Sequence, residues 1–312
     1  MRVFVTGASG WIGSAVVPEL LGAGHDVIGL ARSDASAGAL TTAGAQVQRG
    51  TIDDLDILRR AAAASDAVIH LAFQHDIAFS GGFQEAADAD RHAVETFGEA
   101  LAGSGRPLVI ASGTLMVAPA RVATERDGRD PGSVAHLGGG PQTRATTALL
   151  TLSLASRDVR SCVLRLPPTV HGDGDNGFMA AIVGIARDTG VSGYLGDGSN
   201  RWPAVHRLDA ARLFRLAVEQ APAGSVLHAV ADQGVPIHDI AQVIGRHLNL
   251  PVVSIPPEQA GEHFSWLGRF LGVDAPASSA LTRELLDWLP TQPGLLDDLD
   301  KGHYFDHATA TS

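Results

Sequence analysis

Cysteine is nearly absent from this chain of 312 residues, which contains one, Cys162. A disulfide within the chain is therefore excluded, and the apolar run Cys162–Leu164 predicts a buried thiol rather than a reactive one. The 13 histidines are scattered, without an HExxH motif or a cysteine–histidine cluster. The sequence therefore predicts no metal site.

Basic residues are also in the minority, because 23 lysines and arginines face 34 aspartates and glutamates, for a formal net charge of -11. Nucleic acids and anionic membranes favour a clustered basic face, so we expect neither as a partner. No apolar run approaches the roughly 20 residues that a membrane span needs. The chain enters a strand at once, which leaves no room for a signal peptide. We expect a cytoplasmic protein with a small-molecule ligand.

The chain begins with a strand, a glycine-rich turn and a helix. Val3–Val5 is a short β-type run, Gly7-x-x-Gly10-x-x-Gly13 follows it, and Ser14–Leu21 is compatible with a helix. Glycines in this context let backbone N–H groups approach a pyrophosphate at the positive end of the helix. The order of these elements predicts a dinucleotide site.

Apolar runs alternate with helix-compatible segments over the first half of the chain. This alternation predicts right-handed crossovers and a parallel sheet covered on both faces, which is an α/β, Rossmann-type, doubly wound fold. The expected strands are Val3–Val5, Asp26–Leu30, Ala45–Arg49, Ala67–Leu71, Pro107–Ala111 and Ser161–Leu166, with helices at Asp54–Ala63, Phe83–Ala102 and Pro141–Ser156.

Beyond Pro167 the pattern becomes less regular, starting with a Gly/Asp-rich loop at His171–Gly177. We expect a Rossmann domain at residues 1–170, to which residues 204–230 return. Residues 171–203 and 231–312 are expected to form a smaller, mostly helical C-terminal substrate lobe over the carboxyl edge of the sheet. The helices of this lobe are predicted at Phe178–Arg187, Ile237–Leu248, Glu258–Phe270 and Ser279–Trp288. The residues that return to the Rossmann domain are predicted to form a helix at Ala210–Gln220 and a strand at Ser225–Val230.

Five motifs, in this order, resemble those of the extended short-chain dehydrogenase/reductase superfamily, and within it the NAD(P)-dependent epimerase/dehydratase family. They are Thr6–Gly13 (TGASGWIG), His70–Phe73 (HLAF), Ile110–Thr114 (IASGT), Leu166–Gly172 (LPPTVHG) and Ala204–Ala211 (AVHRLDAA). The resemblance implies an NAD(P) cofactor held at the first turn and at the ends of strands. The residues concerned are Gly7, Ser9, Gly10, Trp11, Ile12, Gly13, Leu71, Ala72, Phe73, Ala111, Pro168 and Val170.

The resemblance fails where the chemistry of that family is concentrated. Its catalytic Tyr-x-x-x-Lys should open the helix after the fifth strand, but Gly138–Ala148 contains neither residue. Counting back from the LPPTVHG loop places Gly140 near the tyrosine position and Arg144 near the lysine position. Arg144 can still hold the ribose hydroxyls as a permanent multi-donor cation, but it cannot replace the phenol as an acid.

The residues after the second strand bear on the choice between NAD and NADP. An acidic side chain there accepts hydrogen bonds from the 2′-hydroxyl of NAD, whereas an arginine and a hydroxyl suit a 2′-phosphate. Arg32 and Ser33 therefore favour NADP, with NAD as the alternative through Asp34. Thr51 and Ile52, after the third strand, are either adenine contacts or part of a simple loop.

Two hydroxyls lie at the carboxyl end of the fifth strand, where the family places a serine that orients the substrate. Either Ser112 or Thr114 is expected to bind a substrate carbonyl, unless both only cap the strand end. Tyr194, His75, His136 and a bound water are the candidates for the missing proton donor. Tyr194 either faces the nicotinamide across a cleft or is a half-buried aromatic of the packing.

Three functions remain open. The leading hypothesis is an NADP-dependent oxidoreductase that acts on a small carbonyl, hydroxyl or sugar-like substrate with an atypical proton path. The alternatives are a non-catalytic NADP-binding regulatory protein and an epimerase or isomerase that uses its bound cofactor transiently. The missing tyrosine favours the regulatory protein, whereas the strand-five hydroxyls and Arg144 favour an enzyme. The resemblance also allows a homodimer through two long helices.

Overall fold

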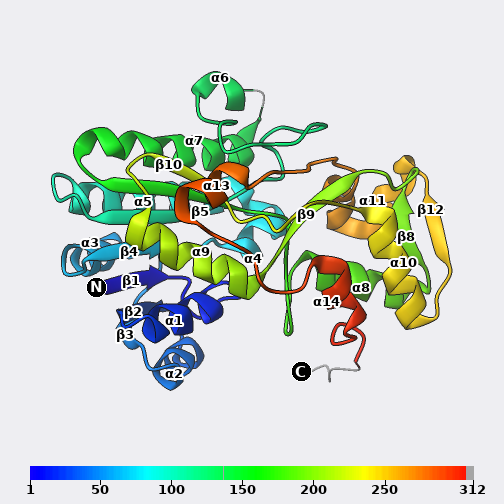
Figure 1. Ribbon diagram of the computed structural model, residues 1–312, viewed down its shortest axis with the longest axis horizontal. Coiled ribbons are helices and arrows are strands. Elements are labelled where there is room, and N and C mark those ends of the chain that lie inside the picture. Colours follow the sequence, from blue (N-terminus) through cyan, green and yellow to red (C-terminus); the bar gives the residue numbers. More distant parts are fainter. Residues whose placement is uncertain (136, 307–312) are drawn as a thin grey trace.

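The computed structural model describes residues 1–135 and 137–306 and has a seven-stranded parallel sheet in its larger lobe (Figure 1). The strand order is β10-β6-β5-β4-β1-β2-β3, which is a doubly wound order and confirms the predicted fold class. The strands are β1 (Arg2–Thr6), β2 (Asp26–Ala31), β3 (Gln46–Arg49), β4 (Ala67–His70), β5 (Pro107–Gly113), β6 (Arg160–Leu166) and β10 (Ser225–His228).

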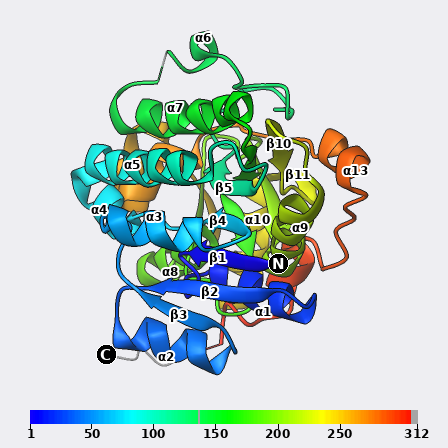
Figure 2. The same ribbon diagram turned by 90° about the vertical axis from the view of Figure 1, so that its left-hand side faces the viewer.

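Helices cover both faces of this sheet (Figure 2). Successive side chains of a strand point to opposite faces, so Val3 and Val5 of β1 join one core cluster while Phe4 joins the other and meets Phe97 edge-on. The first face carries α1 (Gly13–Gly22), α2 (Asp34–Thr42) and α9 (Arg207–Gln220). The second carries α3 (Leu55–Ala63), α5 (Phe83–Leu101) and α7 (Gly139–Ser153).

The smaller lobe contains two small sheets in addition to its helices. The first has the order β11-β9-β7, and the second pairs β12 with β8. Their strands are β7 (Thr169–His171), β8 (Ser192–Leu195), β9 (Arg201–His206), β11 (Asp232–Pro236) and β12 (Val252–Ile255), and the longer helices are α8 (Phe178–Thr189) and α10 (Ile237–Leu248). These strands were not expected, because each is short and pairs only with segments far away in the sequence.

The remaining helices are short. The predicted helix Glu258–Phe270 is instead a series of single turns, because Ser265 has a positive φ of 53° and interrupts the helical hydrogen bonds. The short helices are α4 (His75–Ile77), α6 (Pro131–Val134), α11 (Ala260–Phe264), α12 (Gly268–Leu271), α13 (Ala280–Leu286) and α14 (Leu295–Asp300). A π-helical turn spans Ala78–Gly82, and 3₁₀ turns span Leu154–Arg157, Pro257–Gln259 and Ser265–Leu267.

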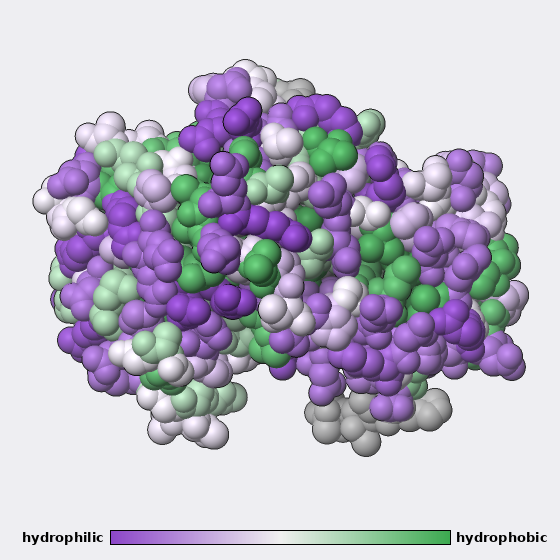
Figure 3. All heavy atoms as spheres, viewed as in Figure 1, coloured by the Kyte–Doolittle hydropathy of each residue, from purple (hydrophilic) through white to green (hydrophobic). Residues whose placement is uncertain are grey.

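The smaller lobe faces the carboxyl edge of the large sheet (Figure 1). Because the strands are parallel, the segments that follow β1, β2, β4, β5 and β6 all lie at this edge. Among the described residues, no helix combines the length and the apolar character that crossing a bilayer requires. The face seen in Figure 3 is largely hydrophilic, with apolar side chains in small separate groups.

His228 of β10 is fully buried in a polar cluster. Its Nδ1 lies 2.8 Å from the carbonyl oxygen of Ser278 and its Nε2 lies 3.3 Å from Nη1 of Arg165. A carbonyl only accepts, so Nδ1 carries the proton and Nε2 accepts from Arg165, which is the neutral form of the ring. Burial, and then the charge of Arg165, lower the pKa of His228 to about 4.

We expect the free energy of unfolding to fall as the pH decreases from 6.5 towards 4. In this range the unfolded chain protonates His228 and the folded chain does not, so protons favour the unfolded state. Urea denaturation at pH 7 and pH 5 measures the effect. In His228→Gln the difference between the two pH values should shrink, whereas in His92→Gln, at an exposed position, it should stay. An unchanged pH dependence in His228→Gln contradicts the assignment.

Candidate functional site

The turn between β1 and α1 requires glycine at two positions. Gly7 has a φ of +65°, and a Cβ there would lie 2.7 Å from the backbone nitrogen of Ala72. A Cβ on Gly13 would lie 2.1 Å from the carbonyl oxygen of Gly7. Ile12, at the N-cap of α1, has no side-chain acceptor for the first N–H groups of the helix. The backbone nitrogens of Ser14 and Ala15 nevertheless donate to the carbonyls of Gly10 and Ile12. The positive end of α1 can therefore face an anion without a side chain of the described residues in between.

A chain of buried polar side chains lies directly behind this turn. The hydroxyl of Thr6 accepts from the backbone nitrogen of Ala72 at 3.3 Å and lies 2.7 Å from Nδ1 of His70. Nε2 of His70 lies 3.2 Å from a carboxylate oxygen of Asp90, and the same oxygen lies 2.6 Å from Nη1 of Arg144. The carboxylate can only accept, so Nε2 carries the proton and Nδ1 accepts from Thr6. Each of these buried groups has a partner.

Arg144 is held by three different elements. Asp90 of α5 binds Nη1, the carbonyl of Ala111 in β5 accepts from Nη2 at 3.0 Å, and the guanidinium lies 4.1 Å above the ring of Phe73. Burial alone raises the pKa of Asp90, but Arg144 and then His70 lower it, so its pKa is below the usual value. A permanent positive charge is thus fixed at the carboxyl edge of β4 and β5.

Gly140, one turn before Arg144 on α7, is packed against the start of α5. A Cβ at this position would lie 2.4 Å from Cδ1 and 2.8 Å from the backbone carbonyl carbon of Phe83. A larger side chain at residue 140 therefore requires a shift of the backbone of α5.

The two hydroxyls after β5 differ in their surroundings. Ser112 is half-buried, whereas Thr114 is 1% exposed and its backbone nitrogen donates to the carbonyl of Leu166 at 3.0 Å. The hydroxyl oxygen of Thr114 is buried and has no hydrogen-bond partner within the described part of the chain. Buried hydroxyls are normally satisfied, so Thr114 has the unused hydrogen-bonding capacity that a ligand carbonyl would take up.

Trp11 joins the glycine turn to the segment that follows β6. Its indole nitrogen donates to the carbonyl of Val170 at 2.9 Å, and the guanidinium of Arg207 lies 4.4 Å above its ring. Trp11 and Val170, both expected at the cofactor, are thus in direct contact. Pro168 lies in the short link between β6 and β7.

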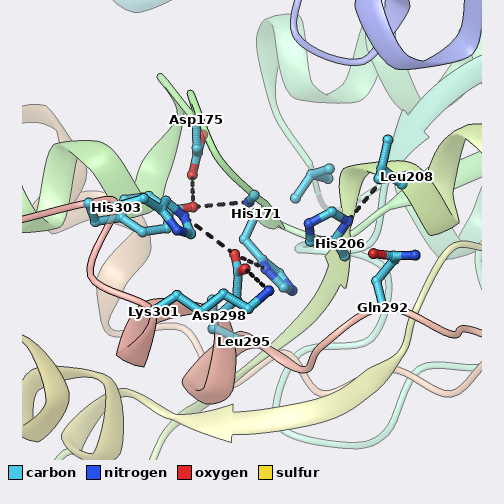
Figure 4. Close-up of polar contacts among 12 residues, drawn as sticks. His171, Asp175, His206, Leu208, Gln292, Leu295, Asp298, Lys301 and His303 are labelled. Carbon is cyan, nitrogen blue, oxygen red and sulfur yellow. Dashed lines mark hydrogen bonds and ion pairs between the residues drawn. The ribbon is translucent and has the colours of Figure 1, made fainter. Parts of the chain in front are cut away.

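The loop at residues 171–177 is fixed from its other side by the C-terminal segment (Figure 4). Tyr304 donates to Asp175 at 2.8 Å and accepts from the backbone nitrogen of Gly172 at 3.2 Å. Nδ1 of His171 lies 2.9 Å from Asp298, to which Lys301 also donates. Burial raises the pKa of Asp298, whereas the hydrogen bond and the charge of His171 lower it, as do the charges of His303 and His206. Together these effects hold the pKa of Asp298 below its usual value. The cluster attaches α14 to β7.

Charged side chains surround the carboxyl end of β2. Arg32 lies 3.6 Å from Asp76, with both side chains largely exposed. Asp34, the alternative acceptor for a 2′-hydroxyl, forms an ion pair with Arg49 at the end of β3. Ser33 caps α2, because its side chain accepts from the backbone nitrogen of Ser36. Arg32 is therefore the cation that the edge of β2 offers to a ligand.

The segment after β3 forms a hydrogen-bonded turn. Thr51 donates to Asp54 through its backbone nitrogen at 2.7 Å and through its hydroxyl at 3.0 Å. Ile52 is buried in the core under α3 and α5. The hydrogen bonds of Thr51 and the burial of Ile52 are contacts within the protein, as expected for a simple loop. A contact of this segment with adenine stays a prediction.

Tyr194 is separated from the other predicted catalytic residues. It lies on β8, its ring packs edge-on against His238 at 4.9 Å, and β8 and β12 lie at the end of the molecule opposite to β1 (Figure 1). The pairing of β8 with β12 causes this placement. The expectation that Tyr194 faces the nicotinamide across a cleft is not supported. His75 packs against Phe73, and His136 lies outside the described residues.

The sequence did not lead us to predict the hydrogen-bonded network of Thr6, His70 and Asp90. The sequence does contain a signal, because Asp90 falls on the buried face of α5, at helical spacing from Ala86, Ala93 and Phe97. A carboxylate within an apolar stripe requires a buried partner.

Comparison with known proteins shows the family of this chain. The family model described as NAD dependent epimerase/dehydratase family matches residues 3–230. The uncharacterized protein C2A9.02 of Schizosaccharomyces pombe is 46% identical over 98% of this chain and 100% of that protein. A ketoreductase of Stigmatella aurantiaca, named for a 4-hydroxy-2-methyl-3-oxo-4-farnesyl-3,4-dihydroquinoline-1-oxide, is 27% identical over 72% of this chain and 67% of that protein.

Solved structures share the fold at low identity. The dTDP-glucose 4,6-dehydratase DesIV of Streptomyces venezuelae, solved with NAD and TYD bound, has a TM-score of 0.74 at 20% identity, and the match covers 97% of this chain and 96% of that chain. By itself, this likeness establishes the fold alone. The family model, which matches residues 3–230, goes further: the chain belongs to the NAD dependent epimerase/dehydratase family.

Proposed function

We propose that this protein is an NADP-dependent oxidoreductase that transfers a hydride between the nicotinamide and a small carbonyl or hydroxyl substrate. The observation that carries the proposal is Arg144, whose guanidinium is fixed by Asp90 and Ala111 at the carboxyl edge of the sheet. The Stigmatella relative is named a ketoreductase, which supports the same reaction class.

The residues at the first turn fit a dinucleotide. Gly7 and Gly13 leave no room for a Cβ, and no side-chain hydrogen bond caps the start of α1, so a pyrophosphate can approach the backbone. Arg144 would hold the ribose hydroxyls, and Arg32 would hold the 2′-phosphate in place of Asp76. When bound, the nicotinamide supplies or accepts the hydride.

Thr114 and Arg144 act on the substrate in this proposal. Thr114 donates from its otherwise unpartnered hydroxyl to the substrate carbonyl, and the charge of Arg144 stabilises the alkoxide that develops on this oxygen. A guanidinium does not release a proton, and Gly140 has no side chain to do so. The proton therefore comes from another group, for which His75, beside Phe73, is the candidate that the site retains.

One observation favours a second function, a non-catalytic NADP-binding regulatory protein. The close contact between Gly140 and Phe83 excludes a tyrosine at residue 140 without a shift of α5. In this alternative the cofactor binds through the same turn and Arg144 serves only the ribose. Turnover of a carbonyl separates the two proposals.

Gly13→Ala should weaken NADPH binding by about tenfold or more, because the new Cβ must displace the carbonyl of Gly7 and open the phosphate turn. Gly22→Ala, at the other end of α1, meets nothing within 4 Å and should leave binding unchanged. Fluorescence titration with NADPH measures both variants. Equal affinities for the two variants contradict the placement of the pyrophosphate.

Arg32→Ala should raise the Kd for NADPH by about tenfold and change the Kd for NADH by less than about twofold, since only NADPH carries the 2′-phosphate. Arg246→Ala, at a surface arginine of the smaller lobe, is the control and should alter neither value. Calorimetric titration with both cofactors provides the comparison. An equal loss for NADPH and NADH overturns the assignment of Arg32.

A panel of small aldehydes and ketones, followed by the loss of NADPH absorbance, tests the reaction itself. Thr114→Val should lower kcat/KM by about tenfold to a hundredfold without changing the Kd for NADPH, because it removes the donor to the carbonyl. Thr146→Val, at an exposed threonine of α7, should behave like the wild type. If NADPH binds but no carbonyl accelerates its oxidation, the regulatory function replaces the enzymatic one.

A further inference from the structure

The strand β7 and the turn that follows it are held between two parts of the molecule. β7 (Thr169–His171) is three residues long and lies at the edge of its sheet, where its neighbour is β9. From the glycine turn, the indole nitrogen of Trp11 donates to the carbonyl of Val170. A three-residue edge strand makes few hydrogen bonds within its sheet, so its position depends on contacts from outside the sheet.

The C-terminal segment holds the same strand from the smaller lobe. Asp298 of α14 is buried, and its carboxylate lies 2.9 Å from Nδ1 of His171 and 3.3 Å from Nζ of Lys301. A carboxylate can only accept, so the proton of the His171 ring lies on Nδ1. His171 and Asp298 point toward one another, with Lys301 beside them (Figure 4). A buried charge is stable only with its partners, so the positions of α14 and β7 are coupled.

The helix α14 is itself fixed at the other edge of this small sheet. The backbone nitrogen of Leu295, its first residue, donates at 2.8 Å to a carboxylate oxygen of Asp232, where β11 begins. Leu295 and Leu299 are buried in the core of the smaller lobe. Because β11 and β7 are the outer strands of the sheet, α14 joins both edges through Leu295 and Asp298. The helix therefore ties β7 to the core of the smaller lobe.

Tyr304 fixes the turn after β7 through a single hydroxyl group. The hydroxyl donates to Asp175 at 2.8 Å and accepts from the backbone nitrogen of Gly172 at 3.2 Å. Burial, and then the charge of Asp175, raise the pKa of Tyr304, so the phenol stays protonated and keeps this donor. Gly172 has a φ of +143°, and a Cβ there would lie 3.1 Å from Nε2 of His206. The turn is thus closely packed, and the hydroxyl of Tyr304 satisfies the buried N–H that opens it.

We infer that Asp298 and Tyr304 are positioning residues of the cofactor site, which hold Pro168 and Val170 where they bind the nicotinamide half of the dinucleotide. The inference rests on the dinucleotide site proposed above and concerns one half of its ligand. The hydrogen bonds of Asp298 and Tyr304 reach β7 and its turn, whereas the adenosine half is expected at the segments after β1, β2 and β3. Loss of either side chain should therefore separate the affinities for the two halves.

Calorimetric titration of the full-length protein with NADPH and with adenosine 2′,5′-bisphosphate, which lacks the nicotinamide, measures this separation. Tyr304→Phe keeps the ring and removes the hydroxyl. It should raise the Kd for NADPH about fivefold or more and change the Kd for the bisphosphate by less than about twofold. NADH and ADP form a second pair of probes, in which neither carries a 2′-phosphate.

Asp298→Ala should have the same selective effect, because it leaves Nδ1 of His171 without its acceptor. Asp298→Asn keeps an acceptor oxygen for this nitrogen. It should bring the ratio of the NADPH and bisphosphate Kd values back to within about twofold of the wild-type ratio. Asp300→Ala, at an exposed position of the same helix that pairs with Arg246, is the control and should change neither Kd.

Two results would overturn the inference: an unchanged ratio in the folded Tyr304→Phe and Asp298→Ala variants, or an equal loss of affinity for both probes. An equal loss is what a general loosening of the structure produces. Circular dichroism and Tm establish that the variants are folded. If NADPH binds but no carbonyl accelerates its oxidation, the oxidoreductase function fails, while the ratio of the Kd values still decides the inference. A wild type that binds none of the four probes contradicts both.

Discussion

The ion pair between Asp90 and Arg144 is the contact on which the arrangement of the site depends. A carboxylate that is 2% exposed is stable only with a charged or hydrogen-bonded partner, and Arg144 and His70 supply both. Through this pair α5 and α7 are placed against each other and against the ends of β4 and β5. The same contact connects the glycine turn, through Thr6 and His70, to the guanidinium of Arg144 at the strand ends.

A second connection runs between the two lobes. Trp11 lies within the glycine turn, yet its indole nitrogen binds the carbonyl of Val170, and the loop that follows is held by Tyr304 from the far end of the chain. The segments expected to contact the pyrophosphate and the nicotinamide are thus in direct contact with each other. The smaller lobe adds a cavity whose lining includes the ion pair between Arg201 and Asp274.

Local patterns were sufficient for much of the fold. The β-type runs and the glycine spacing led to the parallel sheet and the phosphate turn, because both depend on backbone sterics and on neighbours close in sequence. The smaller lobe was harder. Its strands β8 and β12 are four residues each and pair across the whole of β9, α9 and α10. The predicted helix Glu258–Phe270 is interrupted at Ser265, which has a positive φ. Of the two interpretations of Tyr194, its half-buried packing against His238 fits the one of a packing aromatic, and its catalytic role stays a prediction.

The sequence by itself determined that a dinucleotide turn opens the chain, that Arg32 rather than an acid follows β2, and that Gly140 and Arg144 stand where the family has tyrosine and lysine. Each of these statements depends on residue identity at a counted position. Only the tertiary structure decided that Asp90 anchors Arg144, that Phe83 fills the space beside Gly140, and that Asp274 neutralises Arg201. These contacts join residues from different elements, and the free energy of a buried charge depends on such neighbours, which no local pattern specifies.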